Sequence, residues 1–365
     1  MSATSVGVQS GKVMTVLGPI PVEQMGVTLM HEHVVLDTSS WWKRPCCASH
    51  IGLAYKPLDI SMLGELRMNP FLNRDNCGLL DVDVAAEELM HFVEHGGRTV
   101  VDPTNHGIGR DPTALKRISR RTGLHIVMGA GYYLEASHPD EVKAMSIEEI
   151  AQAIARDCGA FGDRPDTCAG LIGEIGISKD FTQAEEKVLR GAARASKISG
   201  VPLSIHLPGW ERLAHRVLDV IEEEGADLNH VVLCHMNPSL DDKAYQRSLA
   251  DRGAFLEYDM IGMDYFYADQ QAQSPCDEEN ANAIRSLIDD GYLDAILLSQ
   301  DVFLKMMLTR HGGFGYGYIL KHFVPRLKRH GIDQATIDHL MIDNPCRVFS
   351  AELRARGKLT SNRGA

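Results

Sequence analysis

The segment His31-Glu32-His33 follows an apolar run that begins at Gly26 and ends at Met30. In an extended strand, alternate side chains lie on the same face, so we expect His31 and His33 to point together and Glu32 to point away. Two neighbouring imidazoles could supply two of the ligands of a metal ion. The helical zinc-protease motif is excluded, because it needs histidines four residues apart and Val35 occupies that position. Two unrelated histidines at a strand end remain the alternative.

Other residues that can bind a metal follow short apolar segments far along the chain, namely Glu174, His206, His235 and Asp301. If these segments are parallel strands of one barrel, their carboxyl ends share a rim and the side chains converge on one cavity. Each residue taken singly is equally well explained as a buried core residue or, for Asp301, as a helix N-cap. The joint pattern favours a metal centre.

The elements that must position these residues alternate regularly along the chain. Strand-like segments are expected at 27–33, 98–104, 124–130, 169–175, 202–206, 230–235, 254–259 and 295–301. Helical periodicity is expected at 82–94, 111–122, 146–161, 182–198, 211–224, 241–252, 277–290, 318–328 and 334–342. Short apolar strands with helical crossovers indicate a parallel sheet. Such units repeated through one chain of this length predict a single (β/α)8 TIM barrel of the α/β class.

A doubly wound nucleotide-binding fold is the competing architecture. It requires a glycine-rich turn after its first strand, with a third glycine that opens the helix. Gly129-Ala130-Gly131 has Leu134 at that third place, and Gly313-Phe314-Gly315 has Tyr318 there. No P-loop sequence is present either, so a bound nucleotide cofactor is not expected.

Two segments lie outside the alternation. Residues 10–26 are expected to form a short N-terminal β extension that turns at Gly18-Pro19. Residues 37–76 are expected to form a long irregular insertion over the barrel mouth, because so long a loop is usually a lid or a binding loop. Its tryptophans could equally pack the rim. We expect residues 1–365 to form a single domain.

Composition excludes several classes of protein. Of the 365 residues, 44% are hydrophobic, and no apolar run is long enough to cross a bilayer. A formal net charge of −12 argues against a nucleic-acid partner. The first residues carry no secretory signal, and the eight cysteines show no CxxC spacing. We therefore expect a cytoplasmic protein with reduced thiols that binds neither nucleic acid nor membranes and acts on a small molecule.

Several of these segments together resemble the phosphotriesterase family of the amidohydrolase superfamily. They are Thr28-Leu29-Met30-His31-Glu32-His33, Val101-Asp102-Pro103-Thr104, Gly173-Glu174-Ile175-Gly176, Ile205-His206, Cys234-His235 and Ser299-Gln300-Asp301. Lys143-Ala144-Met145-Ser146 and His311-Gly312-Gly313 are most similar to the phosphotriesterase-related, or resiniferatoxin-binding, proteins. The resemblance implies a TIM barrel with a binuclear metal centre, most often zinc but also manganese or cobalt. It also implies a homodimer.

The resemblance assigns the more buried ion to His31, His33 and Asp301, and the more exposed ion to His206 and His235. Glu174 stands where a carboxylate bridges the two ions, while Lys179 is the alternative if the bridge is a carbamylated lysine. Two neighbouring cations lower the pKa of a shared water, so that hydroxide forms at neutral pH and attacks the substrate. Asp301 is the expected catalytic residue, because it can accept the proton of that hydroxide.

Two departures from the family pattern bear on the substrate. Organophosphate-degrading members carry a histidine on strand seven, where this chain has Met260. They also carry an acid after the strand-six histidine, where this chain has Met236-Asn237-Pro238. We therefore expect attack on the carbonyl of a small lactone, ester or amide, with weak phosphotriesterase activity at most. A small-molecule binding protein on a hydrolase scaffold, a true phosphotriesterase and a single-metal deaminase stay open as alternatives.

Side chains after several strands are predicted to line a substrate pocket. They are Tyr132, Tyr133, Trp210, Met260, Met263, Asp264, Tyr265, Lys305 and Arg310. Each is equally well explained as rim packing or surface charge. If Lys305 and Arg310 face the pocket, their positive charges would suit a substrate that carries a carboxylate or a sulfonate.

Overall fold

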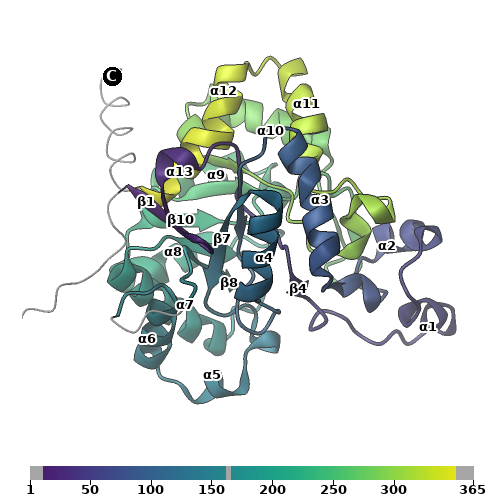
Figure 1. Cartoon of the computed structure of the whole chain (residues 1–365), viewed down its shortest axis with the longest axis horizontal. Coiled ribbons are helices and arrows are strands. Elements are labelled where there is room, and N and C mark those ends of the chain that lie inside the picture. The colour runs from purple at the N-terminus through teal and green to yellow at the C-terminus, as the bar shows by residue number, and fades with distance from the viewer. Residues whose placement is uncertain (1–10, 162–165, 351–365) are drawn as a thin grey trace, which may run out of the picture.

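Eight parallel strands form the centre of the computed structural model, which describes residues 11–161 and 166–350. The strands are β3 (Thr28–Leu29), β6 (Thr99–Asp102), β7 (His125–Ala130), β8 (Leu171–Gly176), β9 (Leu203–His206), β10 (Val231–Leu233), β11 (Phe255–Tyr258) and β14 (Ile296–Leu298). Their hydrogen-bonded order runs from β14 through β11, β10, β9, β8, β7 and β6 to β3. This order curls into a barrel with helices around it (Figure 1), which confirms the predicted TIM barrel.

Side chains and loop backbone, rather than a strand ladder, join the first and last strands in the described part of the chain. The Ser299 hydroxyl accepts a hydrogen bond from His31 N at 2.9 Å. Asp301 N donates to His31 O at 3.1 Å, and His33 N donates to Val302 O at 3.3 Å. The first strand is therefore shorter than the predicted 27–33, because the backbone from His31 onward pairs with the segment after β14. We call this junction the seam.

Helices surround the barrel, except for the first two, which lie in the insertion at 37–76 (Figure 1). Their bounds are α1 (Ala48–Ala54), α2 (Leu63–Met68), α3 (Val82–Glu94), α4 (Pro112–Thr122), α5 (Asp140–Ala144), α6 (Ile147–Asp157), α7 (Gln183–Ser199), α8 (Ala214–Glu223), α9 (Lys243–Asp251), α10 (Asp277–Asp289), α11 (Val324–Arg329), α12 (Gln334–Asp338) and α13 (Asn344–Phe349). Asp111 caps α4, as predicted, and Ser146 forms the predicted capping box with Glu149 at the start of α6. None of the helices in the described residues is long and apolar enough to cross a membrane.

The helices differ from the prediction at some of their ends, and the structure contains short elements that were not predicted. Helix α8 begins at Ala214, three residues later than predicted, because residues before it form a turn. Short π-helical segments, Ile319–Phe323 and His339–Asp343, precede α11 and α13. Helix α5 and the small hairpin of β12 (Phe266–Tyr267) and β13 (Ala272–Gln273) were not predicted, because neither is long enough to show a period.

The insertion at 37–76 is more ordered than the irregular loop that the sequence predicts. Strand β4 (Leu36–Asp37) pairs with β5 (Gly78–Leu79), so the two ends of the insertion are held side by side. Helices α1 and α2 lie within it. The buried Asn73 side chain donates to Leu53 O at 2.7 Å and to Lys56 O at 2.9 Å, which fixes the turn after α1. Side-chain hydrogen bonds of this kind leave no periodic signal in the sequence.

The interior of the barrel is closed at the amino ends of its strands. The inward apolar residues Met30, Val101, Val127, Leu171, Val232, Phe255 and Leu297 form one cluster. The predicted N-terminal hairpin, β1 (Lys12–Thr15) with β2 (Gly18–Pro21), adds Val13 and is followed by Val22 and Met25, while α13 adds Cys346 and Val348. Because this end is packed, a ligand can enter only from the carboxyl ends of the strands.

Candidate metal centre

The side chains predicted as metal ligands lie together at the carboxyl end of the barrel, with Glu174 in the middle. Its Oε1 atom is 3.3 Å from His33 Nε2. Its Oε2 atom is 3.1 Å from His206 Nδ1, 3.5 Å from His235 Nε2 and 3.6 Å from His31 Nε2. One carboxylate thus faces the two histidines that follow β3 and a second pair, of which His206 ends β9 and His235 follows β10.

Asp301 completes the half of the cluster that contains His31 and His33. Its Oδ1 atom is 3.3 Å from His33 Nε2 and 3.6 Å from His31 Nε2. Both Asp301 Oδ1 and His31 Nε2 are buried, and neither has a hydrogen-bond partner among the residues that the structure describes. A buried polar atom left without a partner is costly, and both atoms are of the kind that binds cations. Donor atoms of His31, His33 and Asp301 lie within 4.8 Å of one another, as do those of His31, Glu174 and His235. The residues present therefore fit a divalent-metal centre around the Glu174 carboxylate.

The backbone conformation at the strand ends directs these side chains toward the mouth of the barrel. Gly173 has a φ of 143°, and a Cβ there would lie 2.3 Å from Ser204 O, so only glycine lets β8 approach β9 this closely. The register of β8 against β9 shifts at the same place, next to Glu174. His235 and Asp301 adopt φ values of 58° and 47°, a left-handed conformation that is costly for residues with a Cβ.

Two acids of the β11 segment orient the histidines from below, and the sequence interpretation assigned neither of them. Asp259 Oδ1 lies 3.0 Å from His235 Nδ1, and Asp259 Oδ2 lies 3.3 Å from His31 Nδ1. Glu257 Oε2 lies 3.2 Å from His31 Nδ1. Such partners fix the tautomer of a ligand histidine and raise its basicity. The signal was present in the sequence, because Glu257 and Asp259 alternate on one face of an otherwise apolar strand.

Glu32 points away from the cluster, as predicted, and holds the segment on both sides of Asp301. Its carboxylate accepts hydrogen bonds from Gln300 N and Val302 N, both at 2.9 Å, and from the Ser299 hydroxyl at 2.8 Å. The carboxylate is fully buried. Glu32 therefore acts on the site through the position of Asp301 rather than by direct contact with a ligand.

The carboxylates raise the pKa of His33 and His235, whereas burial and the nearby His235 lower the pKa of His206. Burial lowers the pKa of His33, but the carboxylates of Asp301 and Glu174 outweigh burial and raise that pKa to about 9. Burial likewise opposes the rise at His235, yet the Asp259 carboxylate and its neighbours raise the pKa of His235 to about 10. A metal ion must displace these protons, so cation binding competes with protonation.

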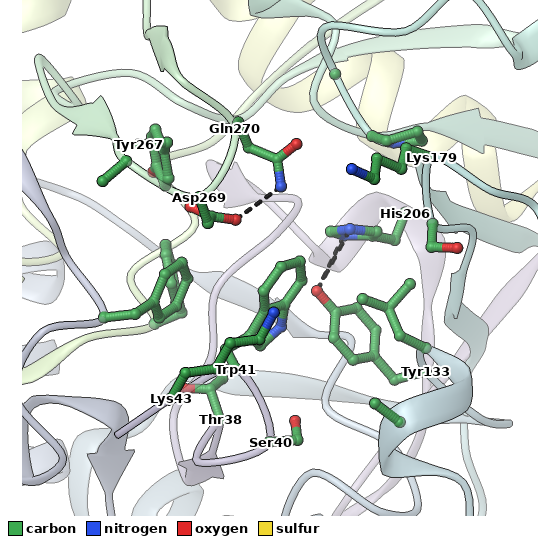
Figure 2. Close-up of a pocket in the computed structure, with 18 of the residues that line it drawn as sticks. Thr38, Ser40, Trp41, Lys43, Tyr133, Lys179, His206, Tyr267, Asp269 and Gln270 are labelled. Carbon is green, nitrogen blue, oxygen red and sulfur yellow. Dashed lines mark hydrogen bonds between the residues drawn. The ribbon is translucent and has the colours of Figure 1, made fainter. Parts of the chain in front are cut away.

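A cavity of about 650 Å³ opens above the cluster (Figure 2). Aromatic side chains form its walls, with Trp41 stacked on Phe71 at 5.3 Å between ring centroids and Trp210 tilted on Tyr267 at 5.3 Å. The Tyr133 hydroxyl lies 3.3 Å from His206 Nδ1. The insertion contributes Trp41 and Phe71, so part of the cavity wall comes from the segment predicted to lie over the mouth.

Of the predicted pocket residues, Tyr133, Trp210 and Met260 line this cavity. Tyr132, Met263, Asp264, Tyr265, Lys305 and Arg310 are not among its described lining residues, which corrects those predictions. Tyr132 instead packs between the rings of His106 and His138. Lys305 forms an ion pair with Asp75 at 2.5 Å, and it lines a separate small pocket with Arg310. The short turns after β14 place both cations beside residues 78–85, which follow the insertion.

Lys179, the alternative bridging residue, is an exposed side chain at the cavity rim, whereas Glu174 lies between the histidine pairs. The sequence interpretation did not consider Lys43 and Arg44, two further cations that line the cavity. Both belong to the insertion, whose path over the mouth no periodicity predicts.

The model of the phosphotriesterase family matches residues 11–349. This chain belongs to the phosphotriesterase family. The predicted resemblance is thereby confirmed. The family and the relatives named as hydrolases together support hydrolase activity. An N-acetyltaurine hydrolase from Tetraodon nigroviridis is 36% identical, and the match covers 92% of this chain and 97% of the relative.

Two solved structures match nearly the whole chain. A resiniferatoxin-binding protein from Rhodobacter sphaeroides is 56% identical, with a TM-score of 0.93, and the match covers 97% of this chain and 99% of the other. A phosphotriesterase homology protein from Escherichia coli, complexed with phosphate in its active site, is 28% identical with a TM-score of 0.72. That match covers 90% of this chain and 99% of the other.

Proposed function

We propose that this protein is a binuclear-metal hydrolase that cleaves a small amide, ester or lactone at its carbonyl group. The position of Glu174 carries the proposal, because one buried carboxylate faces His33 with one oxygen and His31, His206 and His235 with the other. Two divalent ions, most readily zinc but also manganese or cobalt, would satisfy the partnerless buried atoms of the cluster.

The ligands of one ion would be His31, His33 and Asp301, those of the other would be His206 and His235, and Glu174 would be shared. When bound, two such ions supply a water of lowered pKa and a Lewis acid for the carbonyl oxygen.

Two side chains of the chain itself handle protons in this scheme. Asp301 directs Oδ1 at the histidines, and its carboxylate reaches the cavity, so it is placed to accept the proton released during attack. Burial, and then the nearby Glu174 carboxylate, raise the pKa of Tyr133 well above its ordinary value. The Tyr133 hydroxyl therefore stays protonated and can donate a hydrogen bond to the developing oxyanion.

The relatives favour an amide among the carbonyl substrates. The matching enzymes from fish and mammals are named N-acetyltaurine hydrolases and are 33% to 36% identical to this chain. N-acetyltaurine is an N-acyl amide that also bears a sulfonate. Met260 lines the cavity and offers no group for a proton relay, which supports only weak activity on phosphotriesters.

A hydrolysis screen tests this function. N-acyl amides, lactones, aryl esters and phosphotriesters would be offered to protein loaded with zinc or manganese, with metal content measured in parallel. We expect amide cleavage that requires two ions per chain and is lost on chelation. Full activity with one ion per chain, or no cleavage of any carbonyl substrate by the two-ion protein, would refute the proposal.

A binding function is the second candidate, because the Rhodobacter sphaeroides relative is named a resiniferatoxin-binding protein and the cavity has aromatic walls. Calorimetry with resiniferatoxin distinguishes the two functions. Tight binding without any turnover would favour the binding protein, whereas a hydrolase turns over its small substrate whether or not this ligand binds.

A further inference from the structure

Three cationic side chains line the cavity away from the metal cluster. Lys43 and Arg44 belong to the insertion, and Lys179 follows β8. All three are exposed, and among residues 11–161 and 166–350 none of them forms an ion pair with an acid. Lys305, which follows β14, is by contrast paired with Asp75. Positive charges that line a cavity without acidic partners attract anions.

Lys179 stands on a rigid turn. The buried Glu185 carboxylate accepts hydrogen bonds from Ser178 N at 3.0 Å, the Ser178 hydroxyl at 2.8 Å and Thr182 N at 3.1 Å. Phe181 N closes the turn on Ser178 O at 3.0 Å. The backbone of Lys179 is thus fixed while its side chain extends toward the cavity beside His206 (Figure 2). A cation held this way loses little backbone entropy when it binds a ligand.

Lys43 approaches the cavity from another side, next to Trp41 (Figure 2). Two acids, Asp180 and Asp269, also line the rim. Asp269 accepts a hydrogen bond from the Gln270 side chain at 2.7 Å, so its carboxylate is partnered without a lysine. In the described residues no ion pair joins Asp180 or Asp269 to Lys179 or Lys43, so both lysines remain available to a ligand.

We propose that Lys179, assisted by Lys43, binds a negatively charged group at the end of the substrate that is remote from the scissile bond. This inference rests on the proposed function. A carbonyl placed over the metal cluster would leave the rest of a short substrate between the aromatic walls, with its far end among these ammonium groups. A sulfonate or carboxylate suits such donors, so the substrate class is an N-acyl amide with an anionic tail.

The experiment compares N-acetyltaurine with its neutral methyl sulfone analogue, which has the same length. Both are offered to the wild-type protein and to Lys179→Met, Lys43→Met and the control Lys328→Met, whose lysine is exposed on α11. We expect the wild type to prefer the sulfonate. Lys179→Met should lower kcat/KM for the sulfonate about tenfold or more through KM and leave the sulfone unchanged. Lys43→Met should act in the same direction but less strongly, and Lys328→Met should have no effect.

Added salt should shrink the preference of the wild type, because exposed charges are screened. If the wild type cleaves both compounds and neither cavity variant changes their ratio, the inference is overturned and the proposed hydrolase stands. If the wild type cleaves neither compound, the proposed function fails for this class, and binding of propane-1-sulfonate by calorimetry decides the inference. Weaker binding to Lys179→Met than to Lys328→Met supports it, and equal binding overturns it.

Discussion

Replacing Asp259 with asparagine removes one negative charge from beneath both halves of the candidate metal centre. Asp259 lies 3.0 Å from His235 Nδ1 and 3.3 Å from His31 Nδ1, and it also accepts the His235 backbone N–H at 3.0 Å. Asparagine keeps the shape of the side chain, but an NH2 group replaces one carboxylate oxygen. That NH2 group would face an N–H group that now donates to Asp259. We therefore expect both histidines to lose orientation and basicity as ligands.

The magnitude follows from these contacts. Loss of the partner of a ligand histidine costs about 10- to 100-fold in metal affinity, or about 1.4–2.8 kcal/mol. Because His31 is assigned to one ion and His235 to the other, Asp259→Asn should weaken both ions. Thr104→Val is the matched comparison, because His33 is the candidate ligand histidine that the Thr104 hydroxyl contacts, at 2.7 Å from Nδ1. That variant should weaken one ion and spare the other.

Titration with buffered zinc, followed by metal analysis of the separated protein, measures both affinities. Circular dichroism of each variant establishes that the barrel remains folded. The reasoning is refuted if Asp259→Asn keeps two ions at wild-type affinity, or if it loses the same single ion as Thr104→Val. Either result would mean that Asp259 does not support the two halves together.

Four further outcomes are expected. Glu174→Gln should leave fewer than two ions per chain and lower kcat at least about 100-fold, as metal analysis beside steady-state kinetics would show. Glu185→Gln should cost about 1.5–3 kcal/mol of unfolding free energy in a urea titration, because the buried carboxylate accepts three hydrogen bonds from the turn before α7. Lys305→Met should leave KM for anionic substrates unchanged and cost less than about 1 kcal/mol, since its pair with Asp75 is partly exposed. Burial raises the pKa of Asp75, but a backbone N–H and the Lys305 ammonium outweigh it and lower that pKa. The small cost is therefore present above about pH 4 and disappears as pH falls through the lowered pKa, which urea midpoints at acid pH would detect. Removing metal with a chelator should speed amide hydrogen exchange in the segments after β3 and β14, measured by mass spectrometry.

The convergence of the residues that can bind a metal could be predicted, because a parallel barrel brings the carboxyl ends of all its strands to one rim. Glu174, His206, His235 and Asp301 end or follow strands whose apolar runs are visible in the sequence, and every such strand delivers its end to the same rim. Even where β3 proved shorter than predicted, His31 and His33 reached the rim, since the alternation of side chains continues past the last ladder bond.

The cavity wall could not be predicted in the same way, because loops follow no period. Lys305 and Arg310 come after a strand end, as Lys179 does, yet short turns take them to a different pocket. Lys43 lies far from any barrel strand in sequence and still lines the cavity, because the pairing of β4 with β5 holds the insertion in place. Side-chain and backbone hydrogen bonds of this kind decide which loop cation lines the cavity. They produce no periodic pattern of residues in the sequence.

The hydrogen bonds that join the first and last strands at the seam also position two of the candidate metal ligands. His31 and Asp301 belong to opposite ends of the barrel sheet, and the Asp301 N–H bonds to the His31 carbonyl across the gap. Glu32, between the two histidines, holds the other side of the gap through Gln300 and Val302. A cation shared by His31 and Asp301 would therefore close the barrel at the one place where no strand ladder closes it in the described residues. Metal binding and closure of the barrel should then be linked, because each favours the same separation of these two ligands.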